Sequence, residues 1–335
     1  MPTPTPGTEI YVLPSPQAVA TPSQYLVESE NEASPEELAR LRQLALDLIN
    51  EDRAAAGVDP VQLGTNPAAQ LHAENALINR YVGHWWTNGD KPYMVYTETG
   101  GTSYIAENAA GSGWTFENYE ADECGSFRVR CEKSDPEDNI RDNHRNMVHF
   151  DAHAGWGHRD NILDPTHLYV NIGIAYNEWW TAFYQRFEGG HFAAVAGPTL
   201  EDNTFTFRRN TGKFQFSESS IGVFYDPEPK PMSVREIDRL SSYCIGGGAT
   251  DECDIDIREE QIVAWIIEPL SPGWSYPDLD QGYVIASEWT SDGETLPISA
   301  DLGAFSSRSG VYTLVVWGDE ADGNTDDLIM LSARK

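Results

Sequence analysis

The stretch Gly157-His158-Arg159-Asp160-Asn161-Ile162-Leu163 lies directly before two runs that read as β-strands, Tyr169–Tyr176 and Thr181–Phe187. Both runs are short, rich in β-branched and aromatic residues and bounded by polar residues, as strands usually are. The turn region Asn177-Glu178 separates them, so we expect the two strands to pair. A segment that carries a histidine is therefore followed at once by a β-hairpin.

Three helices are predicted around this hairpin. In the first, Ser34–Ala56, the leading serine can cap the helix, Pro35 fits its first position and Glu37 completes a capping box. The second is expected over Pro67–Tyr81, and the third over Pro136–Phe150. Helices mixed with strands indicate an α/β domain.

After Gly189-Gly190 the sequence changes to short β-type runs separated by Gly, Pro and Asp, with one helical stretch at Ser233–Ser242. Strands at this spacing predict an antiparallel β-sandwich. We place the boundary near Gly197-Pro198. The prediction is an α/β domain over residues 34–197, followed by a β-sandwich-like, all-β accessory domain over residues 198–335. The expected strands are Phe205–Arg208, Gly222–Tyr225, Ile262–Ile267, Tyr283–Glu288 and Val311–Trp317.

The chain of 335 residues carries 22 basic and 53 acidic side chains, a net charge of −31. Residues 1–197 hold 28 acidic and 12 basic side chains (−16), and the remainder holds 25 and 10 (−15). Such a field repels phosphate backbones and anionic lipid surfaces, so nucleic-acid binding is excluded. A hydrophobic content of 40% argues for packed cores, and no apolar run is long enough for a transmembrane segment.

Residues 1–33 are rich in Pro, Thr, Ser and Ala and are predicted to be a disordered spacer. The opening residues have neither the basic end nor the apolar stretch of a signal peptide. Surface proteins of bacteria often carry such a spacer between an export signal and the first domain. We therefore expect a secreted or cell-surface protein whose export signal is missing from this chain.

The four cysteines fit that compartment. Cys124 and Cys131 enclose six residues of an acidic loop expected over 111–135, and Cys244 and Cys253 enclose eight. Two local disulfides, 124–131 and 244–253, are the simplest of the three possible pairings. The competing interpretation, a zinc site built from all four cysteines, has unsuitable ligand spacings for a zinc knuckle.

Several features occur in a fixed order within residues 34–190 and together resemble the CAP superfamily, above all its bacterial branch. That superfamily includes cysteine-rich secretory proteins, insect venom allergens and plant pathogenesis-related proteins. The resemblance implies an α-β-α sandwich with a cleft that holds two histidines and usually two acidic residues. It rests on Gly83-His84, Ala106-Glu107-Asn108, Gly157–Leu163, Asn171–Ala175, Tyr184–Phe187 and the end of the first helix.

By motif, His84 and His158 match the two family histidines, and Glu107 matches the first acid. The second acid is normally on the helix before the second histidine. The best alignment puts Asn146 or a neighbour there, with Asp142 and Asp151 as nearby substitutes. A further histidine of that helix, His144, either faces the cleft and joins the metal set or is an ordinary helix histidine.

Two neutral imidazoles can hold a divalent cation such as Zn²⁺ and leave positions for water. A carboxylate such as Glu107 can orient one imidazole or take a proton from bound water. The leading hypothesis is a cleft that binds a divalent metal or a small apolar ligand, in an extracellular interaction role with a glycan or protein partner. The rival is a metal-dependent hydrolase in which His84 and His158 are ligands and Glu107 is the catalytic base.

A third hypothesis assigns binding to the β domain, as an adhesion or carbohydrate-binding surface protein. Its tryptophans Trp265, Trp274, Trp289 and Trp317 would form a carbohydrate platform if exposed. The acidic run Asp319–Asp327 could ligate calcium, but it lacks the ligand order of an EF-hand and is better read as a hairpin loop.

Overall fold

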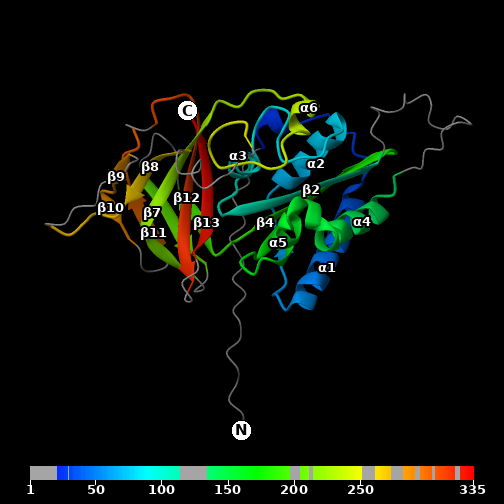
Figure 1. Cartoon of the computed structure of the whole chain (residues 1–335), viewed down its shortest axis with the longest axis horizontal. Coiled ribbons are helices and arrows are strands. Elements are labelled where there is room, and N and C mark those ends of the chain that lie inside the picture. Colours follow the sequence, from blue (N-terminus) through cyan, green and yellow to red (C-terminus); the bar gives the residue numbers. More distant parts are fainter. Residues whose placement is uncertain are drawn as a thin grey trace, which may run out of the picture.

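A four-stranded sheet between helices and, beside it, a pair of sheets make up the protein (Figure 1). The computed structural model describes residues 21–28, 30–113, 134–196, 204–210, 214–250, 261–272, 282–290, 295–303, 306–320 and 325–335. No helix within these ranges is long and apolar enough to cross a membrane.

The first sheet has the strand order β1 (Gln62–Leu63), β3 (Tyr169–Tyr176), β4 (Trp180–Glu188) and β2 (Ile105–Gly113). The predicted hairpin is confirmed, because β3 and β4 pair antiparallel from Tyr169 opposite Glu188 to Tyr176 opposite Thr181. Strand β2 pairs antiparallel with β4 and lies at the edge of the sheet.

The predicted helices are present as α1 (Pro35–Ala56), α2 (Ala68–Asn79) and α4 (Pro136–His149), with shorter helices α3 (Pro92–Glu98) and α5 (Gly157–Leu163). The Ser34 side chain accepts a hydrogen bond from the backbone of Glu37 and caps α1, as expected. Helix α1 ends at Gly57, whose left-handed backbone (φ 76°) suits glycine.

The two faces of this sheet are covered by different helices. Ile172 and Ile174 pack in one apolar cluster with residues of α1, α4 and α5. Ala175 packs in another cluster with residues of α2. Helix α2 comes so close that a Cβ atom on Gly173 would lie 1.9 Å from the carbonyl oxygen of Ala69. The first part of the chain therefore has helices on both faces of one sheet, the α-β-α arrangement that the resemblance implies.

The second part contains two sheets that share one apolar core. Phe207 and Leu296 of the first sheet pack in the same buried cluster as Val223 and Leu314 of the second. The strand orders are β10-β11-β6-β5 and β13-β12-β7-β8-β9. The strands are β5 (Phe192–Ala196), β6 (Thr204–Arg209), β7 (Phe214–Pro227), β8 (Ile262–Ile267), β9 (Tyr283–Ile285), β10 (Glu288–Trp289), β11 (Thr295–Ser299), β12 (Gly310–Glu320) and β13 (Thr325–Arg334).

Strand β5 already belongs to the sheets of the second part, since it pairs antiparallel with β6. The change in sequence after Gly189-Gly190 therefore coincides with the change of sheet. The helix expected over Ser233–Ser242 is shorter, α6 (Val234–Ile237). The acidic run at Asp319–Asp327 joins β12 to β13, which pair antiparallel as expected for a hairpin.

Two further expectations concern the chain outside these elements. The spacer prediction over residues 1–33 is wrong at its end, because a 3-10 turn at Ser23–Tyr25 buries Tyr25 against Trp86 and Val95.

Cys244 is disulfide-bonded. Its predicted partner Cys253, and the pair Cys124 and Cys131, lie outside the described residues, so the pairing stays a prediction.

The two parts join through a shared apolar cluster. Tyr93 and Tyr96 of α3 pack with Phe224 of β7, Val315 of β12 and Met330 of β13. The segment around α6 crosses back onto the first part, where Ile237 is fully buried beside α2. The sandwich and the β domain therefore pack as one unit.

A buried arginine holds the segment that carries His158. Arg53, at the end of α1, is fully buried and donates to the carbonyls of Asp59 (2.7 Å), Ile162 (2.7 Å), Asp164 (2.9 Å) and His167 (3.3 Å). The guanidinium thus ties α5 and the loop after it to α1.

We expect Arg53→Met to lower the free energy of unfolding by about 3 kcal/mol, since the methionine leaves buried carbonyls without a donor. Urea unfolding of the full chain measures this change. Arg40→Met removes an exposed arginine from the same helix and should cost no more than about 1 kcal/mol. Equal losses in the two variants would contradict the anchoring role of Arg53.

Candidate functional site

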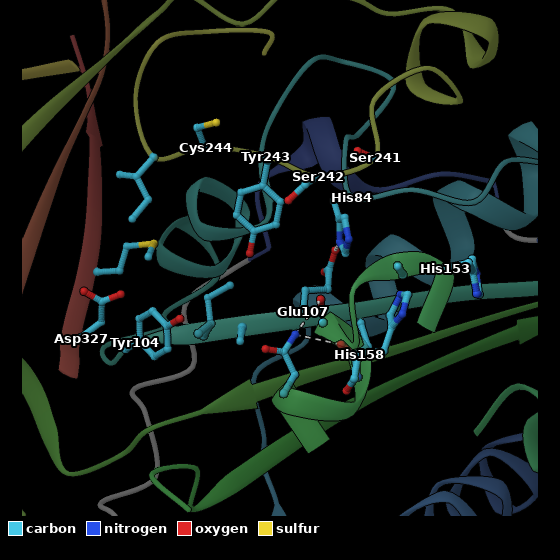
Figure 2. Close-up of a pocket in the computed structure, with 18 residues that line it drawn as sticks. His84, Tyr104, Glu107, His153, His158, Ser241, Ser242, Tyr243, Cys244 and Asp327 are labelled. Carbon is cyan, nitrogen blue, oxygen red and sulfur yellow. Dashed lines mark hydrogen bonds and ion pairs between the residues drawn. The ribbon is translucent and has the colours of Figure 1, made fainter. Parts of the chain in front are cut away.

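A cavity of about 670 Å³ lies where the two parts of the chain meet. Strand β2 and the start of α5 line one side, and residues 241–245 and strand β13 line the other. Figure 2 shows Tyr243, His84 and Glu107 around this space, with His158 beside Glu107. The lining residues are His84, Tyr104, Ile105, Ala106, Glu107, Asn108, His153, Ala154, Gly157, His158, Asn161, Ser241, Ser242, Tyr243, Cys244, Ile245, Asp327 and Met330.

The first histidine of the cavity is held by a buried carboxylate. Glu107 of β2 accepts a hydrogen bond from His84 Nδ1 (3.1 Å), and also from His72 Nδ1 (3.2 Å) and Arg186 Nε (3.0 Å). Arg186 Nη2 contacts the same carboxylate oxygen as His72. Burial alone would raise the pKa of Glu107, but Arg186 and the histidines lower it well below its usual range. Glu107 is therefore a charged acceptor.

The second histidine is held in the same way from the other side of the sheet edge. Asp151, buried in the 3-10 turn Asp151–Ala154, accepts from His158 Nδ1 (2.7 Å) and from the His158 backbone (2.9 Å). Asn161 donates to Asn108 (2.9 Å), and Asn108 donates to the carbonyl of His158 (3.0 Å). These bonds fix α5 against strand β2.

The two histidines thus share one arrangement. In each, Nδ1 donates to a carboxylate, so the ring presents Nε2, the tautomer that can ligate a metal through that atom. Both line the cavity, with His84 14% and His158 27% exposed. No group of three or more His, Cys, Asp or Glu in the described part of the chain is arranged to hold a metal ion. A cation at these histidines would take its remaining ligands from solvent or a bound molecule.

The structure corrects the expected second acid. Asn146 and Asp142 are exposed on α4 and do not line the cavity, whereas Asp151 contacts His158 directly. His144 is buried, and its Nε2 lies 2.8 Å from Asp52 of α1, so it belongs to the packing of α1 on α4. It does not line the cavity.

Three residues that shape the site were not predicted as parts of it. Arg186 occupies a buried strand position, where an arginine requires a charged partner, and this was the available signal. His72 is stacked between Trp86 (4.7 Å) and Tyr184 (4.1 Å), which holds its ring against Glu107. Tyr243 comes from a segment far along the chain, and nothing local points to the cavity.

Comparisons with known proteins add little to this geometry. No protein-family model and no curated protein matches the chain. The chain is similar to an extracellular protein with an SCP domain from Bacillus anthracis (16% identity, TM-score 0.30, 48% of this chain and 45% of that one). It is also similar to the CAP domain of enterococcal PrgA (15% identity, TM-score 0.30, 48% and 64%). The matches span less than two-thirds of either structure, and at this TM-score neither likeness decides the function.

The buried histidines predict a pH dependence of stability. Burial lowers the pKa of His72, His144 and His167 below 6.5, against the opposing effect of nearby carboxylates. Below that pH the unfolded chain binds protons that the folded chain excludes. The free energy of unfolding should therefore fall as pH drops below 6.5, by up to about 1.4 kcal/mol per pH unit for each histidine.

Urea unfolding between about pH 5 and 8 measures this slope. His167→Gln should reduce the slope, because it removes one of the buried titrating groups, and the exposed His149→Gln should leave it unchanged. A stability that is flat or rises toward pH 5 would contradict the burial of neutral histidines.

Proposed function

We propose that this is an extracellular CAP-type protein whose cleft binds a divalent cation of the Zn²⁺ class through Nε2 of His84 and His158. The carrying observation is that each imidazole donates its Nδ1 hydrogen to its own carboxylate, Glu107 or Asp151, and lines the same cavity. Such carboxylate–histidine pairs fix the tautomer and raise the basicity of the ligating nitrogen. When bound, the cation supplies a Lewis-acidic centre to which a small molecule can add an oxygen donor.

The lining favours a polar ligand over the small apolar one. Eleven of the eighteen lining residues carry polar side chains, among them Ser242 and Tyr243. Such groups strengthen the binding of a ligand that forms hydrogen bonds with them. They weaken the binding of an apolar molecule, because it leaves them without a hydrogen-bond partner. A small molecule with oxygen donors and a modest apolar part fits this lining best.

The contacts of Glu107 speak against the hydrolase alternative. A general base needs a pKa near the working pH and an acceptor site within reach of water. Glu107 is fully buried at its side chain, accepts from three other side chains and has a pKa well below its usual range. It is better suited to orient His84 than to take a proton.

Two features support an extracellular setting. Cys244 is disulfide-bonded, and disulfides persist in oxidising compartments. The net charge of −31 suits a solvated surface and disfavours anionic partners. A carbohydrate platform on the β domain gains no such support, because Trp265 and Trp317 lie against each other with ring centroids 5.7 Å apart and pack against the core between the two parts. Trp274 lies outside the described residues.

Zinc titration of the full chain by calorimetry tests the proposal. We expect His84→Ala and His158→Ala each to weaken zinc binding by about 100-fold or more, since each removes one of two protein ligands. Asp151→Asn should weaken it by about 10- to 100-fold by loosening the orientation of His158.

His149→Ala is the matched control, because His149 is exposed on α4 and does not line the cavity. Its zinc affinity should equal that of the unmodified chain. Unchanged affinity in both His84→Ala and His158→Ala would overturn the proposal. Turnover of an ester or peptide library that disappears in Glu107→Gln would instead restore the hydrolase alternative.

A further inference from the structure

The cleft has a wall that the first part of the chain does not supply. Residues 241–246, called the roof segment below, cross over the cavity, and five of them line it. Figure 2 shows Ser241, Ser242, Tyr243 and Cys244 along this stretch of chain, with the Tyr243 ring pointing into the cavity. The ring meets His84 edge-on, at 5.4 Å between centroids, and lies 6.0 Å from Tyr93.

Side chains from the first part of the chain hold the backbone of the roof segment at three carbonyls. Trp85 Nε1 donates to the carbonyl of Ser242 (2.9 Å). Lys91 Nζ donates to the carbonyls of Cys244 (2.7 Å) and Gly246 (2.8 Å). A loop whose carbonyls accept from buried donors of another element has one position and not several.

The third donor hydrogen of Lys91 goes to Asp226 Oδ1 (2.7 Å), at the end of β7. Asp226 also accepts from the Tyr93 hydroxyl (2.7 Å) and from the backbone of Gly248 (2.9 Å). Lys91 is 1% and Asp226 0% exposed, so the ion pair is sealed from solvent. Separating a buried pair leaves an uncompensated charge in the interior, so the arrangement that keeps Lys91 beside Asp226 is favoured.

The chain next to the roof segment is built to pass around this pair. Gly246, Gly247 and Gly248 all have left-handed backbones, with φ between 76° and 79°. A Cβ atom on Gly247 would also lie 2.6 Å from the Gln261 side chain. Three consecutive residues in this conformation require glycine and bring two backbone groups to Lys91 and Asp226.

We propose that the second part of the chain completes the cleft: Tyr243 determines which molecules reach His84, and the Lys91–Asp226 pair is the positioning element that holds Tyr243 there. The proposal rests on the cleft being the binding site proposed above. It limits the ligand to a small molecule that fits a cavity of about 670 Å³ beneath the roof segment. The Tyr243 hydroxyl, which is protonated near neutral pH as in any tyrosine, offers such a ligand a hydrogen-bond donor.

Diethyl pyrocarbonate, which acylates accessible imidazole nitrogens, tests the proposal in the full chain without metal. The rate at His84 is followed by peptide mass spectrometry, with exposed His149 as the internal reference. We expect Tyr243→Ala to raise the rate at His84 relative to His149 by about fivefold or more, and Tyr243→Phe to leave it unchanged. Lys91→Met combined with Asp226→Leu removes both charges and should raise the rate at His84 by a similar factor.

Tyr283→Ala is the matched control, because Tyr283 is 47% exposed on β9 and does not line the cavity. It should leave the ratio of the two rates unchanged. An unchanged ratio in Tyr243→Ala overturns the role of Tyr243, and an unchanged ratio in the double variant overturns the positioning role of the pair. If the double variant does not fold, hydrogen exchange at residues 241–246 in Lys91→Arg decides the second point, and unchanged protection there overturns it.

The labelling also separates this proposal from the one before it. Absence of zinc binding in the unmodified chain would remove the metal function, while the change in labelling at His84 would still report the roof segment. Conversely, the Tyr243→Ala variant and the double variant could bind zinc normally and show no change in labelling at His84. That result would overturn the role of the roof segment and leave the metal function intact.

Discussion

A buried carboxylate, Glu107, sets the geometry of the cleft and of the sheet beside it. Its side chain has no exposure to solvent, so its charge must be compensated within the protein. Arg186 supplies that compensation from directly across the β2–β4 ladder, where the two residues are register partners. A one-residue slip of β2 would turn Glu107 to the other face and leave a buried charge without its partner. The ion pair therefore fixes the register that delivers Glu107 to His84.

The same constraint explains what the sequence could and could not predict. Helix α1 could be predicted because Ser34, Pro35 and Glu37 stabilise the start of their own helix. The strands Tyr169–Tyr176 and Trp180–Glu188 could be predicted because their residues locally favour β-structure. Strand β2 was not expected as a whole, because Ala, Asn, Gly and Ser are weak strand formers. Pairing with β4 decides its conformation, and the paired residues, such as Ile105 and Glu188, lie far apart along the chain.

The site residues also divide into those predictable from local sequence and those placed by contacts between distant parts of the chain. His84, Glu107 and His158 could be found from their motifs, and these three line the cavity. The carboxylate at His158 was expected only as one of several substitutes, because Asp151 lies in a turn after α4 and not on the helix where the resemblance puts the second acid. The left-handed residues Gly155 and Trp156 turn the chain back so that His158 meets Asp151. The roof segment was also beyond reach, since Lys91 and Cys244 are 153 residues apart along the chain.

The join between the two parts is more than a contact surface. Arg334 of the last strand pairs with Asp90 (2.6 Å) and with Glu98, and Tyr25 of the N-terminal segment donates to the same two acids. Helix α3 and the turn before it thus contact both ends of the described chain, while Lys91 in that turn holds the roof segment. A cation held by only two histidines would exchange readily in an open cleft. Because residues 241–245 of the second part line that cleft, they would limit access to the proposed cation site, whose two histidines come from the first part.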